Sequence, residues 1–162
     1  MFHPRAACEF ADALEAQWRA IRKEYLGIRG ELIDWLEPEL YDRGWKVFGL
    51  FDFPHGHPIA ANIAKCPVTA GLIAQHVRRH GAAGFSVLEP RTRIRPHHGY
   101  AGNFLRVHLP LDIPAGDCGL RVAGEMRRWE TGTVMVFDDR AEHEAWNETD
   151  EERVVLLIDF CP

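Results

Sequence analysis

Two histidines are the residues whose type and position best suit metal chemistry. His97 and His143 are 46 residues apart (143 − 97 = 46), and each adjoins polar loop residues at the end of an expected strand. Histidine is the commonest metal-binding side chain, and the sequence contains nine of them. On spacing alone, ordinary surface or hydrogen-bonded histidines are the better explanation, so the pair is only a candidate metal site.

Arg153 suggests an anion site nearby. It follows His143 by ten residues (153 − 143 = 10) and begins the apolar segment RVVLLIDF, which is expected to be a core strand. An arginine directed into a core needs an anion, and its planar fork can bind a carboxylate through two hydrogen bonds. Each such bond contributes about 1.5–3 kcal/mol, enough to offset burial of the charge. The alternative is a structural ion pair with Glu142 or Glu144.

The segment NFLRVHLPL carries polar and apolar side chains on opposite faces of an expected strand. Arg106 and His108 share one face, and the leucines and valine around them share the other. The polar face is either the solvated side of an antiparallel sheet or, if it lines a barrel interior, an anion site.

The sequence predicts that these residues lie mainly on β-strands. Periodic apolar residues predict an amphipathic helix over 10–28, Pro67 begins a helix that ends ahead of Gly81, and 31–40 suggests a short helix. A strand over 45–53 precedes a Pro- and Gly-rich loop. Beyond Gly84, turn residues separate short strand-like segments: FSVL, TRIR, NFLRVHL, GLRVA, MRRWE, TVMVF, EHEAW and RVVLLIDF. This order predicts a mainly β (α+β) fold, a jelly roll or small barrel with helices packed outside.

Length and composition limit the classes of function. The 162 residues fit a single domain, with a helical N-terminal part over 1–43 and a β core over 44–162. A net charge of -5 without a basic block argues against nucleic-acid binding.

No signal-peptide pattern or bilayer-length apolar stretch is present, so we expect neither secretion nor membrane insertion. The four cysteines lack C-x-x-C spacing and suit a reducing cytoplasm. Small molecules are the expected partners, and the oligomeric state stays open.

Several linked segments resemble the aspartyl/asparaginyl β-hydroxylase family. They are RPHHGYAGNFLRVHLPLDIP, CGLRV, RRWETG, VFDDRAEHEAWN and RVVLLIDF, within a similarity that runs from about Trp45 to Phe160. The resemblance implies a double-stranded β-helix, which is a cupin-like jelly roll. It also implies an Fe(II)/2-oxoglutarate-dependent dioxygenase that uses O2 to hydroxylate an unactivated C–H bond, with succinate and CO2 as coproducts and ascorbate as reductant in vitro.

The same resemblance assigns roles to individual residues. His97 and His143 would be the iron ligands, and Arg153 would bind the distal carboxylate of 2-oxoglutarate. Further contacts to this cosubstrate would come from Ser86, Arg106 and His108.

Gly99 stands where most non-haem iron oxygenases have a third, carboxylate ligand, two residues after the first histidine. The family resembled here also lacks that carboxylate, so we expect water in its place. Asp139, four residues before His143, could hydrogen-bond this water and is the expected catalytic residue. Iron halogenases also have a small residue at this position, so halogenation is an alternative, although Asp139 favours hydroxylation.

The substrate is not encoded in a recognisable motif. The resemblance suggests a free or peptidyl amino acid or a lipid acyl chain, and we expect an amino-acid-like substrate that is free or carrier-bound. The alternative from another class is a non-redox cupin-like protein that binds a metal or small anion. That protein would need the histidines but not Arg153.

Overall fold

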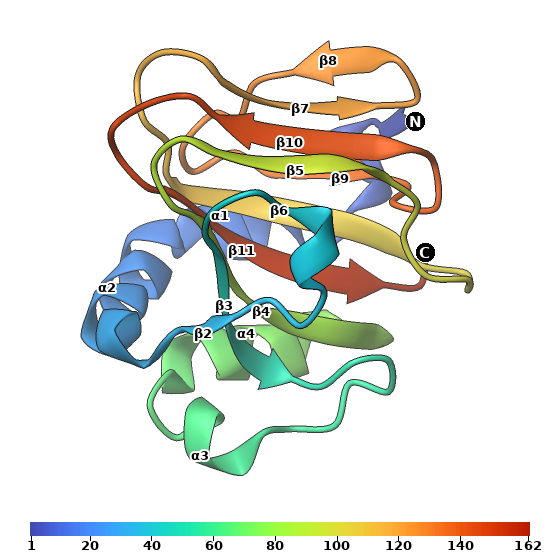
Figure 1. The fold of residues 1–162 in the computed structure, drawn as a ribbon. Helices are drawn as coiled ribbons and strands as arrows, with labels where there is room; N and C mark the ends of the chain where they lie inside the picture. Colours follow the sequence, from blue (N-terminus) through green and yellow to red (C-terminus); the bar gives the residue numbers. More distant parts are fainter.

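Two antiparallel β-sheets lie face to face in the computed structural model, which describes residues 1–162 (Figure 1). The larger sheet has the strand order β1-β9-β6-β11-β4-β3-β2, and the smaller has the order β5-β10-β7-β8. Helices α1, α2 and α4 pack on the side of the larger sheet that faces away from the smaller one (Figure 1). This arrangement confirms the expected jelly roll with helices outside.

The bounds of the elements are as follows. The strands are β1 Phe2–His3, β2 Ile33–Asp34, β3 Trp45–Phe51, β4 His80–Leu88, β5 Thr92–His97, β6 Leu105–Asp112, β7 Cys118–Val122, β8 Glu125–Arg127, β9 Met135–Phe137, β10 His143–Asn147 and β11 Arg153–Phe160. The α-helices are α1 Ala11–Ala16, α2 Trp18–Ile28, α3 Ala60–Ile63 and α4 Pro67–His76. None of these helices is both long and apolar enough to cross a membrane.

Side-chain alternation along β11 and β6 divides the interior into two layers. Val154, Leu156 and Ile158 of β11 belong to a core of 27 buried residues between the larger sheet and the helices. Val155 belongs to a second core of 11 buried residues between the two sheets. Arg153 shares the face of Val155, because side chains of a strand alternate between its two faces. The polar face of these strands is therefore enclosed between the sheets and is not the solvated one.

All three expected helices differ from the structure, and two of them lie before Trp45. The helix over 10–28 is present, but it bends at Gln17, so that α1 and α2 each bury apolar side chains against the same sheet. The expected helix over 31–40 is wrong. This segment forms β2 and a 3-10 turn over Pro38–Leu40, because the Trp35 ring stacks on Trp45 at 4.2 Å and extends the chain along β3.

The helix that begins at Pro67 ends earlier than the sequence predicts. It stops at His76, and Val77 leaves the helical conformation with its side chain buried in the helix-side core. Gly81 lies inside β4 and does not terminate the helix. Each of the strand segments expected after Gly84 overlaps a strand of the structure. Residues 1–43 also supply β1 and β2, which pair with β9 and β3.

Candidate active site between the two sheets

His97 and His143 lie directly opposite each other in the smaller sheet. They are paired across β5 and β10, and their ring centroids are 4.2 Å apart. His143 is only 5% exposed, whereas His97 is half-buried. The strand pairing thus brings together two residues that are far apart in the sequence and leaves one of them accessible from solvent.

Both rings are oriented by backbone carbonyl groups. The Nδ1 atom of His97 lies 2.8 Å from the carbonyl oxygen of Arg95, and Nδ1 of His143 lies 2.9 Å from that of Ala141. A carbonyl oxygen can only accept, so each Nδ1 carries the proton and each Nε2 is free to bind a metal ion. Burial and the neighbouring His97 lower the pKa of His143 to about 3, so its ring is neutral, as a metal ligand must be.

Arg153 is a buried cation without a carboxylate partner. Its side chain is 1% exposed, its Nε has no hydrogen-bond partner, and its Nη1 reaches only the carbonyl oxygen of Ser86 at 3.4 Å. Burial lowers the pKa of Arg153 to about 10. Glu142 and Glu144, which could have paired with it, form ion pairs with Arg121. An unsatisfied buried guanidinium is costly, and it indicates a site for an anion.

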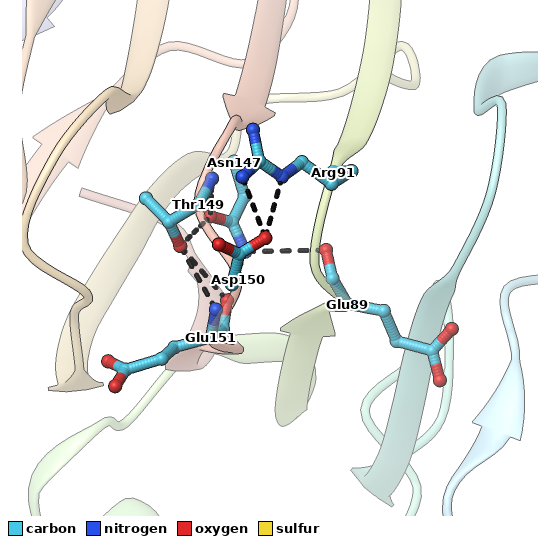
Figure 2. Close-up of polar contacts among 6 residues, drawn as sticks. All are labelled: Glu89, Arg91, Asn147, Thr149, Asp150 and Glu151. Atoms are coloured by element: carbon cyan, nitrogen blue, oxygen red, sulfur yellow. Dashed lines mark hydrogen bonds and ion pairs between the residues drawn. The ribbon is translucent and has the colours of Figure 1, made fainter.

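A network of hydrogen bonds fixes the connection between β10 and β11, which leads into Arg153 (Figure 2). Asn147 is fully buried, and its Nδ2 donates to the carbonyl oxygens of Leu88, Glu89 and Glu151. Thr149 donates from its hydroxyl and from its backbone N–H to the side-chain oxygen of Asn147. The β10–β11 connection is thereby fixed to the end of β4.

Ser86 and His108 line the same cavity as Arg153, on either side of β11. Ser86 Oγ accepts a hydrogen bond from the indole of Trp45 at 3.0 Å, and His108 Nδ1 accepts one from the indole of Trp129 at 3.2 Å. Burial and the nearby Arg153 hold the pKa of His108 well below 6.5. Both polar side chains are nearly inaccessible from outside.

Arg106 also lines the cavity, but its charge is already paired. Its guanidinium donates twice to Asp159, at 2.7 and 2.9 Å, and its Nη2 lies 3.0 Å from Asp139 Oδ2. No hydrogen bond involves Nη1, which is the nitrogen that a ligand could use. A cosubstrate contact of Arg106 therefore stays a prediction, whereas its structural role with the two carboxylates is visible.

Asp139 occupies the space that a side chain at position 99 would need. A Cβ added to Gly99 would lie 2.6 Å from Asp139 Cγ and 2.8 Å from its backbone oxygen. The Gly99 N–H donates to that oxygen at 2.7 Å. Asp139 is 4% exposed, and burial raises the pKa of its carboxyl group although Arg106 opposes the shift. The carboxylate of Asp139, which precedes β10, therefore occupies the space in which a ligand side chain at position 99 would begin.

Replacing Gly99 with alanine is expected to weaken metal binding about 10–100-fold, because Asp139 would have to leave its position beside the histidines. Titration of the protein with Co(II), followed by its visible spectrum, measures this affinity. Gly27→Ala is the matched control, since a Cβ at Gly27 meets no atom within 4 Å. Equal affinities of Gly99→Ala and the unmodified protein would show that Asp139 does not need this position.

The polar groups of the cavity have the chemistry that Fe(II) and 2-oxoglutarate would need. Two free imidazole nitrogens suit the metal, and the unpartnered Arg153 suits a carboxylate. No group of three or more His, Cys, Asp or Glu side chains is placed to hold a metal ion. The enclosed part of the cavity measures about 30 Å³. The lining comprises Trp45, Ser86, Ile94, His97, Arg106, His108, Leu120, Phe137, His143, Ala145, Arg153 and Leu157.

Three residues near the site were not assigned to it from the sequence. Trp45 lines the cavity and contacts Ser86, whereas Trp129 lies outside the lining and contacts His108; both belong to the core between the sheets. Asp159 pairs with Arg106. The alternation of RVVLLIDF places Asp159 on the face of Arg153, which could have revealed its inward direction. His98 is exposed and lies outside the cavity.

Comparison with known sequences gives a consistent result. A family model described as aspartyl/asparaginyl beta-hydroxylase matches residues 15–162. The match begins before Trp45 and so includes α2, which the motifs alone leave out. The Mus musculus protein named aspartyl/asparaginyl beta-hydroxylase is 33% identical over 159 residues, or 93% of this chain and 21% of that protein. The Rhizobium tropici ornithine lipid ester-linked acyl 2-hydroxylase is 36% identical over 168 residues, or 92% of this chain and 59% of that protein. The chain therefore spans only part of these relatives.

Solved structures support the fold. A Pseudomonas putida prolyl-4-hydroxylase has a TM-score of 0.60 at 18% identity, covering 91% of this chain and 86% of that one. A predicted oxalate decarboxylase from Thermotoga maritima has a TM-score of 0.51 at 11% identity, covering 81% and 90%. At these identities the similarity concerns the double-stranded β-helix and not the reaction.

Proposed function

This chain belongs to the aspartyl/asparaginyl β-hydroxylase family, and from this premise we propose that it is an Fe(II)/2-oxoglutarate-dependent dioxygenase. Its substrate would be an amino-acid-like molecule, hydroxylated at an unactivated C–H bond. The observation that carries the proposal is the buried guanidinium of Arg153, which lacks an anionic partner in the same cavity as two histidines with free Nε2 atoms.

The two histidines, Arg153 and Asp139 each have a part in this proposal. When bound, Fe(II) and 2-oxoglutarate supply the oxidation, in which O2 converts the cosubstrate to succinate and CO2 and hydroxylates the substrate. His97 and His143 would hold the metal, and Arg153 would bind the distal carboxylate of the cosubstrate. Asp139 would accept a hydrogen bond from a water at the third ligand position, and this is its catalytic role. The apolar wall between the sheets would exclude bulk water.

Hydroxylation suits this site better than halogenation. Chloride would have to bind where Gly99 leaves space, yet Asp139 already places a carboxylate there, and like charges in a buried site repel each other. Arg106 is the one cation paired with both Asp139 and Asp159, so this cluster offers no spare positive charge to chloride. A protein that only bound a metal would have no use for an unpaired Arg153.

The substrate class rests on the relatives. The mammalian relative is named for aspartyl and asparaginyl residues, and the Rhizobium tropici relative is named for the ester-linked acyl group of an ornithine lipid. An amino-acid group is common to both names, so we propose a free, peptidyl or carrier-bound amino acid for this chain. The four free cysteines, of which three are buried, are consistent with a cytoplasmic location.

Cosubstrate turnover without a substrate is the direct test. We expect the purified protein, supplied with Fe(II), ascorbate, O2 and 2-oxoglutarate, to form succinate slowly. His143→Ala should lose this activity, because one of only two protein ligands is removed. Product mass in the presence of chloride then separates hydroxylation from halogenation once a substrate has been found among amino acids and their conjugates.

If no succinate forms, anaerobic titration of the Fe(II)-loaded protein with 2-oxoglutarate decides the question. A visible charge-transfer band would show that the cosubstrate binds and that only turnover is slow. Absence of both succinate and the band would contradict the proposal and favour the metal-binding alternative.

A further inference from the structure

Trp45 lines the cavity and Trp129 contacts two of its lining residues, His108 and Arg153, yet each indole N–H is used on a side chain of the cavity wall. Trp45, on β3, donates to Ser86 Oγ at 3.0 Å, and Trp129, in the connection after β8, donates to His108 Nδ1 at 3.2 Å. Both tryptophans are at most 5% exposed. Each indole therefore uses its only donor on a polar group of the cavity wall.

The contact with Trp129 determines where His108 carries its proton. Because Nδ1 accepts from an indole, which can only donate, a neutral His108 must carry its hydrogen on Nε2. Burial and the charge of Arg153 oppose a second proton on this ring. His108 is thus a hydrogen-bond donor through Nε2.

The contact with Trp45 likewise makes Ser86 a hydrogen-bond donor toward the cavity. Its hydroxyl oxygen accepts from the indole and makes no other hydrogen bond, so the hydroxyl hydrogen is free to donate to a ligand. Ser86 and His108 lie on β4 and β6, the two strands that flank β11, where Arg153 adds a group that only donates. The face of the Trp129 ring lies 4.9 Å from the guanidinium carbon of Arg153 and favours its positive charge.

We propose that Trp45 and Trp129 are positioning residues that hold Ser86 and His108 as hydrogen-bond donors, so that the polar groups around Arg153 select an anionic cosubstrate. The inference rests on the proposed function, because it takes 2-oxoglutarate as the anion. It assigns to two tryptophans a role that packing alone would not require, since phenylalanine could fill much of the same space.

The test uses Trp129→Phe, which keeps an aromatic ring and removes the N–H. ¹⁵N NMR of the Zn(II)-loaded protein, with His108 assigned from a His108→Gln variant, reports which ring nitrogen carries hydrogen. We expect only the Nε2–H form in the unmodified protein and a population of the Nδ1–H form in Trp129→Phe. Anaerobic titration of the Fe(II)-loaded protein should show about 3–10-fold weaker binding of 2-oxoglutarate in this variant.

Two further variants separate a positioning role from a general loss of packing. Trp45→Phe should weaken 2-oxoglutarate binding to a similar extent without changing the His108 tautomer. Trp146→Phe should change neither quantity, because that half-buried indole donates to Asp117 and lies outside the cavity.

An Nδ1–H His108 in the unmodified protein would overturn the inference even if no variant folded. An unchanged tautomer and an unchanged affinity in Trp129→Phe would also overturn it. If the tautomer shifts as expected but the unmodified protein does not bind 2-oxoglutarate, the assignment of this cosubstrate fails, while the effect of the indole on His108 stands.

Discussion

Replacing Arg153 with methionine is expected to abolish 2-oxoglutarate binding without destabilising the fold. Two charge-assisted hydrogen bonds to a carboxylate are worth about 3–6 kcal/mol together, which corresponds to roughly 100–20,000-fold in affinity. Arg153 has no carboxylate partner to leave unpaired, so an apolar side chain of similar length should unfold at the same or a higher urea concentration. Anaerobic titration and urea unfolding measure the two effects.

The opposite signs of these effects distinguish a binding residue from a structural one. Arg121→Met is the matched control, because Arg121 forms partly exposed ion pairs with Glu142 and Glu144 outside the cavity. Its removal should cost at most about 1 kcal/mol of stability and leave 2-oxoglutarate affinity unchanged. A large loss of stability in Arg153→Met with normal cosubstrate binding would show that the arginine serves the fold.

Replacing Arg106 with methionine should have its largest effect on stability. The change leaves Asp159 and Asp139 buried without their shared cation, and breaking a buried ion pair by removing one partner costs about 3–5 kcal/mol. Urea unfolding of the variant measures this loss. Because Asp139 would also lose its orienting partner, metal affinity should fall in the same variant.

Comparison with two other variants identifies the origin of that loss. Arg140→Met removes an exposed pair with Asp138 and should cost at most about 1 kcal/mol. Adding Asp159→Leu to Arg106→Met should recover part of the stability, since one of the uncompensated carboxylates is removed. A single-variant loss below about 1 kcal/mol would mean that water reaches the carboxylates and solvates them.

Local pattern was sufficient to predict most of the strands after Gly84. Apolar residues alternate or run continuously there between turn residues, and these signals depend only on neighbours in the chain. The same pattern failed for 31–40, where stacking of Trp35 on Trp45 draws the segment onto β3. Residues distant in sequence decide such a segment, so its own composition could not reveal it.

The family, the jelly-roll class and the residue types of the site could be predicted from the sequence, because motifs and alternation are properties of the chain. Which charges are free became visible only in the folded arrangement of the strands. Arg106 and Arg153 look equivalent in sequence, yet β-strand register places Asp159 opposite Arg106 and no carboxylate beside Arg153. Whether a buried cation is available to a ligand depends on its neighbours in space, and strand pairing across the sheets sets those neighbours.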